Sequence, residues 1–306
     1  MIVNFNTRER LRSCLSALGV RHEIIVIDNA SSDGSADMVA AEFPHAVLIA
    51  NTKNFGFGAA NNQGLDAMTG DLALLLNSDA EMTPEAIDLL ASEFRDPGVV
   101  AAGAGQRDEN GDWRASAANR LTVWAVFCEQ TLLEKLLRFS PFDSYWIRPP
   151  SKGEKSPPTR EVEQVMGACL MMRPVERFDE RFFLYCEDTE LCLRLRQHGR
   201  ILYVASVTCF HALGASSSQD RWRSVARYNF GKELYFAIHH GRLASSVCFV
   251  FNRMGATLRL LIWGFSTLVT LGTVARLRVQ AGLFWRVFTA PRLGPARPDG
   301  KPPALP

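Results

Sequence analysis

Five consecutive apolar residues, 72–76 (LALLL), run directly into the acidic step Asn77-Ser78-Asp79. An apolar run of this length is typical of a strand buried on both faces, as strands of parallel sheets are. Ligands of open parallel sheets bind beyond the carboxyl ends of the strands. At such an end the Asp79 carboxylate can hold a hard cation, which in turn holds a diphosphate. The simpler alternative is that Asp79 caps a helix beginning near Pro84.

Strand and helix patterns alternate through the first hundred residues. Strands are expected at 2–5, 23–27, 47–50 and 72–76, and helices at 8–18, 37–43 and 54–67. Strands that alternate with helices form right-handed βαβ units around a parallel sheet. The sequence therefore predicts the α/β class.

The charge of the chain is unevenly distributed. Residues 216–306 carry 13 Lys and Arg against three Asp and Glu, whereas residues 1–215 carry 21 against 29. Such a basic C-terminal part is expected to face an anionic partner, either a membrane surface or nucleic acid. The aliphatic residues between its arginines favour lipid over nucleic acid.

The seven cysteines are scattered and contain no C-x-x-C pair. This spacing argues against a disulfide framework and a structural zinc site, and favours a reducing compartment. Met1 leads directly into a strand pattern, so no signal peptide is expected.

Residues 260–275 form a stretch of 16 residues without charge, flanked by Arg259, Arg276 and Arg278. A membrane-spanning helix needs about 20 apolar residues, so an interfacial or re-entrant helix is expected instead. The alternative is a buried helix pair packed on the core. We therefore predict a basic, apolar, membrane-associating helical extension over 216–290, followed by a disordered Pro-rich tail over 291–306.

Two segments of the first half carry candidate nucleotide ligands. Asp28 follows an expected strand, and its carboxylate can accept a hydrogen bond from the imide N–H of uracil or thymine, or it can simply cap a turn and helix. Gly56 and Gly58 open an expected helix, where backbone N–H groups can bind a phosphate and Lys53 adds a cation. The third glycine of a dinucleotide fingerprint is missing, and the segment comes after two βα units, so a nicotinamide cofactor is not expected.

Two further segments carry candidate catalytic and metal-binding groups. Glu187 and Asp188 begin an expected helix after the apolar residues 182–185, which can poise one carboxylate as a general base. An acidic first turn also occurs for reasons of the helix dipole alone. His211 follows the apolar residues 201–207 and is either a structural histidine or a ligand.

Taken together and in this order, these segments resemble an inverting family 2 glycosyltransferase of the GT-A fold, in particular the bacterial rhamnosyltransferase-like branch. The matching pieces are 3–6 (VNFN), 27–34 (IDNASSDG), 54–61 (NFGFGAAN), 76–79 (LNSD), 167–170 (GACL), 185–188 (YCED) and His211. The resemblance covers roughly residues 1–215. It implies a Rossmann-like, mostly parallel sheet flanked by helices, with a nucleotide-sugar-binding half at 1–100 and an acceptor-binding, catalytic half at 101–215.

The resemblance also implies roles for individual positions. Asp28 would contact the nucleobase, with Asn4 and Asn6 nearby. The nucleotide-sugar pocket would be lined by two further segments, which contribute Lys53, Asn54, Gly56, Asn61, Asn77, Ser78 and Asp79. Asp79 and His211 would bind the metal ion. Asp188 would be the catalytic base, with Glu187 beside it.

The reaction implied is a single displacement that inverts the anomeric carbon, assisted by Mg²⁺ or Mn²⁺. The expected donor is a dTDP- or UDP-sugar, with rhamnose the first choice. The expected acceptor is a lipid-linked saccharide at the cytoplasmic face of the inner membrane, in assembly of cell-surface polysaccharide. The chain departs from the family pattern at Asn77, where many relatives carry Asp, and so loses one unit of charge near the metal.

Two other function classes are compatible with parts of the sequence. A sugar-nucleotide nucleotidyltransferase or another nucleotide-binding α/β enzyme also uses a parallel sheet and acidic metal ligands. That class usually opens with a loop rich in glycine and basic residues, however, and residues 6–10 (NTRER) contain no glycine. A non-catalytic, basic-tailed binding protein would explain the charge of the tail alone.

Overall fold

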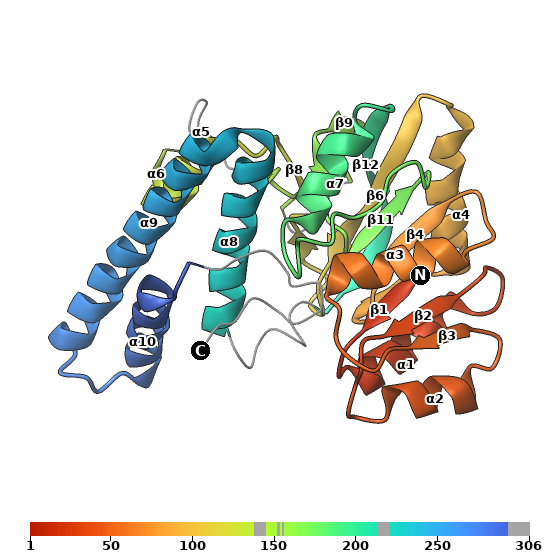
Figure 1. The fold of residues 1–306 in the computed structure, drawn as a ribbon, viewed down its shortest axis with the longest axis horizontal. Helices are drawn as coiled ribbons and strands as arrows, with labels where there is room; N and C mark the ends of the chain where they lie inside the picture. The colour runs from red at the N-terminus through yellow and green to blue at the C-terminus, as the bar shows by residue number, and fades with distance from the viewer. Residues whose placement is uncertain (138–144, 152–153, 155, 213–220, 293–306) are drawn as a thin grey trace.

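The computed structural model describes residues 1–137, 145–151, 154, 156–212 and 221–292 (Figure 1). Of the predicted disordered tail at 291–306, residues 293–306 lie outside this part of the chain.

A ten-stranded sheet forms the centre of the N-terminal two thirds, with the strand order β3-β2-β1-β4-β11-β6-β12-β5 and two strands attached at its side. Strands β1 to β4 are mutually parallel, as are β6 and β12, whereas β11 runs antiparallel between β4 and β6. The strands of the main order are β1 (Ile2–Asn4), β2 (Ile25–Asp28), β3 (Val47–Ala50), β4 (Ala73–Asn77), β5 (Ala80–Glu81), β6 (Val99–Arg107), β11 (Cys169–Met172) and β12 (Arg200–His211).

Short strands extend this sheet or lie beside it. β7 (Trp113–Arg114) pairs with β6, and β9 (Arg160–Val162) pairs with β12. β8 (Ala117–Ala118) and β10 (Gln164–Val165) form a separate two-stranded sheet.

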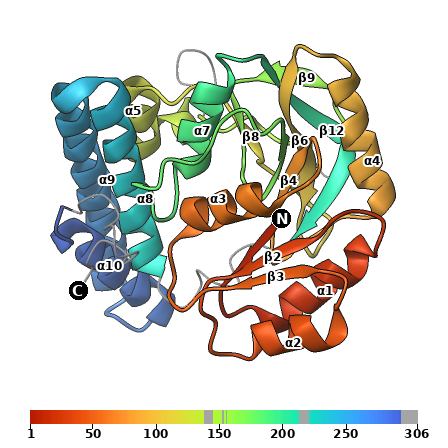
Figure 2. The ribbon, with the colours of Figure 1, turned by 45° about the vertical axis from the view of Figure 1, so that its right-hand side comes forward.

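Helices cover both faces of the sheet, which confirms the predicted α/β class (Figure 2). One face packs against α1 (Arg8–Leu18), α2 (Ser35–Glu42), α4 (Pro84–Ser92) and the 3₁₀ turn η1 (Glu93–Arg95). The other face packs against α3 (Phe57–Ala67) and α7 (Glu187–Leu195).

The apolar run at 72–76 forms most of β4, a strand buried on both faces. In β4 the side chain of Leu76 joins the core under α1 and α4, whereas that of Leu75 joins the core under α3 and α7. In the neighbouring β11, Met171 and Leu170 divide between the two cores in the same way. Because successive strand residues point to opposite faces, a strand covered on both sides has to be apolar throughout.

A helical region lies beside the sheet (Figure 1). It consists of α5 (Val123–Thr131), α6 (Leu133–Leu136), α8 (Arg221–His239), α9 (Gly241–Val269) and α10 (Ala275–Thr289). Tyr235, Phe236 and Cys248 of α8 and α9 share a buried cluster with Val126 of α5 and Phe182. Part of α8 and α9 is therefore packed on the rest of the protein.

Residues 260–275 do not form one continuous helix, and their expected association with a membrane stays a prediction. Helix α9 ends at Val269, and a turn with Leu271 and Gly272 in left-handed conformation reverses the chain into α10, which begins at Ala275. Glycine adopts this conformation without steric cost, which explains the reversal inside an apolar stretch. None of the helices within the described ranges is long and apolar enough to cross a membrane.

Candidate active site

The carboxyl ends of β1 and β2 meet in a corner of polar side chains that we call the β1 corner: Asn4, Thr7, Asp28, Ser31 and Ser78. Asn4 pairs with Asp28 in the parallel register. The Asn4 amide donates to Asp28 Oδ1 at 2.8 Å and to Ser31 Oγ at 3.0 Å, and the Ser31 backbone N–H donates to Asp28 Oδ2 at 2.9 Å. A carboxylate accepts about four hydrogen bonds, so Asp28 keeps acceptor capacity for a ligand.

Thr7 connects this corner to the acidic step after β4. Its hydroxyl donates to Asn4 Oδ1 at 2.7 Å and lies 2.7 Å from Ser78 Oγ. Thr7 stands at the N-cap position of α1 but does not cap the helix, because its hydroxyl is engaged across the sheet edge. Sequence analysis missed Thr7, because threonine just before a helix is commonly a capping residue.

Asn6 shapes the loop above the corner. Its backbone is left-handed, with φ at 53°. Its N–H donates to Ser31 Oγ at 2.9 Å, and its side-chain oxygen accepts from the Ser32 N–H at 2.7 Å. Asn6 therefore joins the loops that follow β1 and β2, next to Asn4 as expected.

Asp79 and His211 form a close pair at the same edge of the sheet. His211 Nε2 lies 3.2 Å from Asp79 Oδ1 and 3.4 Å from the amide nitrogen of Asn77. The sequence placed His211 beyond a strand ending at Val207, but β12 continues to His211 and pairs with β5 there. A register shift between Val204 and Thr208 breaks the apolar pattern and hides this continuation.

Gln106 of β6 orients the imidazole of His211. Gln106 Oε1 lies 3.0 Å from His211 Nδ1, and this network assigns the proton to Nδ1. The lone pair of Nε2 then faces the Asp79 carboxylate, an arrangement that a shared proton or cation stabilises. Metal-ligating histidines are typically held this way by a hydrogen bond to their other nitrogen.

Asp79 and His211 together fit a divalent cation that takes most of its ligands from substrate and water. Asp79 and His211 offer one carboxylate and one imidazole, and no group of three or more His, Cys, Asp or Glu suited to a metal exists within the described ranges. Mg²⁺ is commonly held by one or two carboxylates together with substrate phosphates and water. Asn77 adds no charge, so the charge of the site rests on Asp79.

The glycine-rich segment before α3 packs tightly against the chain near residue 183. Gly56 has a φ of 90°, and an added Cβ would lie 2.4 Å from the carbonyl oxygen of Phe183. The Phe57 N–H donates to that same oxygen at 2.9 Å, and Asn54 Oδ1 accepts from the Gly56 N–H at 2.9 Å. Only glycine allows this approach.

Asn61 and Lys53, two residues predicted to line the nucleotide-sugar pocket, lie outside the contact between Gly56 and Phe183. Asn61 is 1% exposed, and its amide donates to the Phe57 carbonyl inside α3 at 3.0 Å. Lys53 is exposed, with Nζ 4.7 Å from the centroid of the Phe55 ring. The geometry makes Asn61 part of the helix interior and keeps Lys53 at the surface.

We call the turn that opens α7 the α7 corner: Tyr185, Cys186, Glu187 and Asp188. The Asp188 carboxylate accepts the backbone N–H of Gly167 at 3.0 Å and that of Thr189 at 2.8 Å. Burial raises the pKa of Asp188, and these two hydrogen bonds oppose the rise. The helix start thus holds a carboxylate whose proton affinity is higher than in water.

Glu187 is less well satisfied. Its side chain is buried, and Oε2 has no hydrogen-bond partner among the residues that the structure describes. Burial raises the pKa of Glu187 well above its ordinary value, and the neighbouring Asp188 charge adds to the rise.

A short chain of contacts joins the α7 corner to the acidic step. Gly167 donates to Asp188, and the next residue, Ala168, accepts the N–H of Asn77 through its carbonyl at 3.1 Å. The backbone at the start of β11 therefore lies between Asp188 and the end of β4. It brings the α7 corner and the Asp79–His211 pair to one edge of the sheet, although Asp79 lies over a hundred residues before Asp188 in the sequence.

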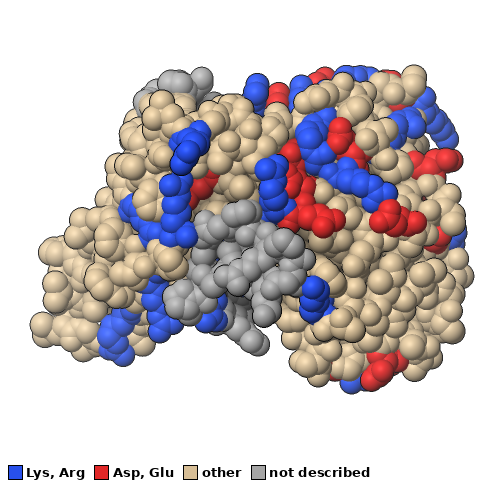
Figure 3. Space-filling view, in the orientation of Figure 1, with Lys and Arg blue, Asp and Glu red and all other residues tan. Residues whose placement is uncertain are grey.

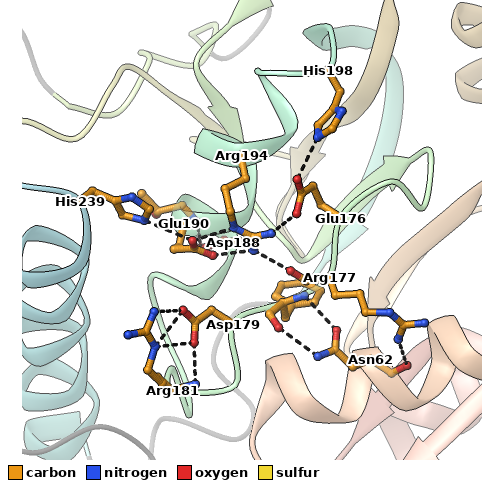
Figure 4. Close-up of polar contacts among 12 residues, drawn as sticks. Asn62, Glu176, Arg177, Asp179, Arg181, Asp188, Glu190, Arg194, His198 and His239 are labelled. Atoms are coloured by element: carbon orange, nitrogen blue, oxygen red, sulfur yellow. Dashed lines mark hydrogen bonds and ion pairs between the residues drawn. The ribbon is translucent and has the colours of Figure 1, made fainter.

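A polar network fixes α7 and the loop before it (Figure 4). Glu190 is buried and contacts Arg194 of its own helix at 2.7 Å and His239 of α8 at 3.2 Å. Asn62 of α3 donates to the Phe178 carbonyl at 3.0 Å and accepts from its N–H at 2.9 Å. Sequence analysis missed these residues because the partners of Asn62 and His239 lie far away in the sequence.

Comparison with known proteins gives a consistent result. The family model "Glycosyl transferase family 2" matches residues 1–173. An N-acetylglucosaminyl-diphospho-decaprenol L-rhamnosyltransferase, found in two strains of Mycobacterium tuberculosis, is 26% identical over 268 residues, covering 78% of this chain and 83% of the relative.

Solved structures resemble the whole fold. A mannosyltransferase of Pyrobaculum calidifontis in complex with GDP-Man and Mn²⁺ superimposes with a TM-score of 0.50 at 14% identity, covering 94% of this chain and 83% of that one. GalNAc-T7 with UDP, GalNAc and Mn²⁺ also gives a TM-score of 0.50, at 16% identity, covering 77% of this chain and 49% of that one.

Proposed function

The chain belongs to glycosyl transferase family 2 and is a glycosyltransferase with a GT-A fold, and on this premise we propose that it transfers rhamnose from a nucleoside-diphosphate donor to a lipid-linked saccharide. The observation that carries the proposal is the convergence of Asp28, Asp79 and Asp188 on one edge of the sheet, through contacts of β1, β4 and the start of β11. The rhamnosyltransferase relative supports the choice of sugar.

In this proposal the β1 corner binds the nucleoside. Asp28 keeps acceptor capacity for the imide N–H of uracil or thymine, which favours a UDP- or dTDP-sugar. Asn4 and Asn6 hold Asp28 and its loop in place. Asn54 and Gly56 bring the start of α3 against Phe183, just before the α7 corner, and the positive end of the α3 dipole would favour the sugar-phosphate part of the donor.

Asp79 and His211 would hold the divalent cation, Mg²⁺ or Mn²⁺, with diphosphate oxygens and water as the remaining ligands. When bound, the cation neutralises charge on the departing diphosphate. Ser78 and Asn77 keep Asp79 at the end of β4, and Gln106 keeps His211 aimed at it.

Asp188 is the proposed general base. It takes the proton of the acceptor hydroxyl while that oxygen bonds to the anomeric carbon and the bond to the diphosphate breaks. Because the oxygen attacks from the face opposite the diphosphate, the configuration inverts. Burial raises the pKa of Asp188, which brings its proton affinity closer to that needed for base catalysis near neutral pH.

The acceptor side of the proposal rests on the end of the α9–α10 hairpin, residues 261–279, which we call the hairpin tip. Large apolar side chains are exposed there, with Phe265 at 69%, Leu268 at 74% and Leu271 at 90%. The basic residues Arg276 and Arg278 stand beside them. Exposed apolar groups with neighbouring arginines suit a bilayer containing anionic lipid.

Figure 3 shows basic side chains spread over α8, α9 and α10, with few acidic ones, whereas acidic side chains gather on the sheet side. We propose that the hairpin tip seats the enzyme as a peripheral protein on the cytoplasmic face of the inner membrane. There the catalytic edge meets an acceptor of the kind named for the relative, a saccharide linked to decaprenol through a diphosphate.

One experiment tests the reaction. Purified protein is titrated with dTDP-rhamnose, UDP-sugars and GDP-sugars in Mn²⁺, and each donor that binds is offered with lipid-linked N-acetylglucosamine. We expect binding of a thymidine or uridine donor and transfer of rhamnose. Failure of every nucleotide sugar to bind would refute the proposed function, and transfer of another sugar would correct the donor.

A second experiment tests the membrane contact. The full chain should float with vesicles containing phosphatidylglycerol, and Phe265→Glu with Leu268→Glu should abolish flotation. The matched control is Leu89→Glu, which alters an equally exposed leucine on α4, on the sheet. Equal flotation of all three proteins would rule out the hairpin tip.

A further inference from the structure

Helix α8, although it follows the matched family region, contacts the turn that presents the catalytic carboxylates. The rings of Tyr185 and Tyr228 meet edge to face with centroids 6.3 Å apart. The Cys186 thiol lies 3.9 Å from the Tyr228 carbonyl. His239, at the end of the same helix, contacts Glu190 in the first turn of α7.

The turn itself holds an unusual backbone. Tyr185 and Cys186 are consecutive non-glycine residues with positive φ, 73° and 67°. Cys186 is the N-cap residue of α7 and makes no side-chain cap. Bulky residues in this conformation persist only where the surrounding structure holds them, and they occur preferentially at functional sites.

Gly231 of α8 is where the two segments approach most closely. A Cβ added at Gly231 would lie 2.6 Å from the Tyr185 carbonyl oxygen, and 3.0 Å from both Cβ and Sγ of Cys186. Gly231 has no positive φ, so its own backbone gives no reason for glycine inside a helix. Alanine is the better helix former, which leaves the close approach as the reason.

A buried ion pair fixes α8 in this position. Lys232, the next residue, is fully buried, and its Nζ lies 2.8 Å from Glu129 of α5 and 4.4 Å from the centroid of the Tyr228 ring. A buried ammonium group requires such a partner, because its desolvation is costly. The pair therefore determines how α8 faces Tyr185 and Cys186.

We propose that Gly231 is a positioning residue for the proposed base: the absence of its side chain lets α8 seat against Tyr185 and Cys186 and hold the left-handed turn that aims Asp188. This inference rests on the proposed function. It extends the catalytic unit beyond the sheet into the C-terminal helices, at a distance from the β1 corner that binds the donor.

The test is Gly231→Ala in the full-length protein, with the matched control Gly282→Ala in α10, where an added Cβ meets no atom within 4 Å. Displacement of a reacting group by about 1 Å costs on the order of 10²-fold in rate. We expect Gly231→Ala to lower kcat by that order while the donor Kd stays unchanged. Gly282→Ala should change neither quantity.

A rescue separates positioning from general damage. Cys186→Gly accepts the left-handed conformation freely and removes the two atoms nearest the new methyl group apart from the Tyr185 carbonyl. The double variant Gly231→Ala/Cys186→Gly should recover part of the lost kcat. Should Gly231→Ala fail to fold, Tyr228→Leu replaces it, since it removes the ring contact to Tyr185 but keeps an apolar side chain.

The outcomes are distinct. A kcat unchanged in Gly231→Ala, or in Tyr228→Leu if that variant replaces it, overturns the positioning role. An equal loss of donor affinity and kcat also overturns it, because it shows general disruption. If wild-type protein binds no nucleotide sugar, the proposed function fails, a result visible before any variant is made.

Discussion

The β1 corner and the α7 corner lie on one edge of the sheet, yet they are built in opposite ways. In the β1 corner, hydroxyl, amide and carboxylate groups satisfy one another, with contacts of 2.7 to 3.0 Å between Asn4, Thr7, Asp28, Ser31 and Ser78. In the α7 corner, two residues hold positive φ and a buried Glu187 oxygen lacks a partner among the described residues. A satisfied network favours rigid binding, whereas raised proton affinity favours proton transfer.

The largest effect is expected at Asp188. Asp188→Asn keeps the shape of the side chain but removes the proposed base, and its single amide oxygen can replace only one of the two carboxylate oxygens that accept the Gly167 and Thr189 N–H groups. We expect the transfer rate to fall by about 10²–10⁴-fold. Initial rates at saturating donor and acceptor measure this effect. The control is Asp179→Asn, which alters a carboxylate paired with the surface residue Arg181. A similar loss of rate in both variants would show that Asp188 is not the general base.

The orientation of His211 gives a second test. Gln106→Leu removes the acceptor of His211 Nδ1, and it also removes an amide nitrogen that has no partner within the described ranges. Stability should change little, whereas Mn²⁺ affinity should fall by about 10–100-fold, as for other residues that orient a metal ligand. Calorimetric titration of Mn²⁺ in the presence of nucleoside diphosphate measures it. Unchanged affinity would mean that His211 does not hold the cation.

Much of the β1 corner could be predicted from sequence, because its residues follow strands that the apolar pattern marks. Asn4 and Asp28 are the last residues of β1 and β2, and Ser78 directly follows β4. Contacts between segments that are far apart in the sequence could not be predicted from the apolar pattern. Gln106 looks like an ordinary strand residue, and Gly231 looks like a weak point in a helix. Thr7 precedes a helix, where threonine commonly acts as a cap, and nothing in the local sequence indicates that its hydroxyl contacts Asn4 and Ser78.

Thr7→Val removes a hydroxyl from the hydrogen bonds of the β1 corner but keeps the shape of the side chain. The variant leaves Asn4 and Ser78 without their shared hydroxyl, and loss of a buried hydrogen-bond partner costs about 1–3 kcal/mol. Chemical denaturation should show this decrease in the free energy of unfolding. Thr289→Val, whose hydroxyl bonds only within the last turn of α10, should stay within about 0.5 kcal/mol of wild type. Equal stability of the two variants would show that the network contributes little.

Glu187→Gln tests whether burial of the Glu187 carboxyl group lowers the free energy of unfolding. Burial raises the pKa of Glu187 above its unfolded value, so the folded state keeps a proton that the unfolded state releases. The free energy of unfolding should therefore fall as pH rises above about 4.5, the unfolded pKa, until the folded pKa is reached. Glu187→Gln should match wild type at acid pH and exceed it at pH 7. Parallel stability curves across this range would contradict the assignment.

The smallest expected effect is at the hairpin tip. Arg276→Gln should weaken binding to anionic vesicles about fivefold, since one basic residue near such a surface contributes about 1 kcal/mol. Sedimentation with vesicles of increasing phosphatidylglycerol content measures it. The control Arg21→Gln removes a basic residue paired with Asp88 on the sheet side and should leave vesicle binding unchanged. Equal weakening in both would indicate a general charge effect.

We propose that the β1 corner binds the donor and the α7 corner accepts the proton, and two variants measured side by side separate these roles. Donor Kd and the transfer rate at saturating donor are determined for Asp28→Asn and Asp188→Asn. Asp28→Asn is predicted to raise the Kd about tenfold or more, through loss of a charge-assisted hydrogen bond, and to keep the rate. Asp188→Asn is predicted to keep the Kd and lose the rate. Loss of the same property in both variants would contradict the account.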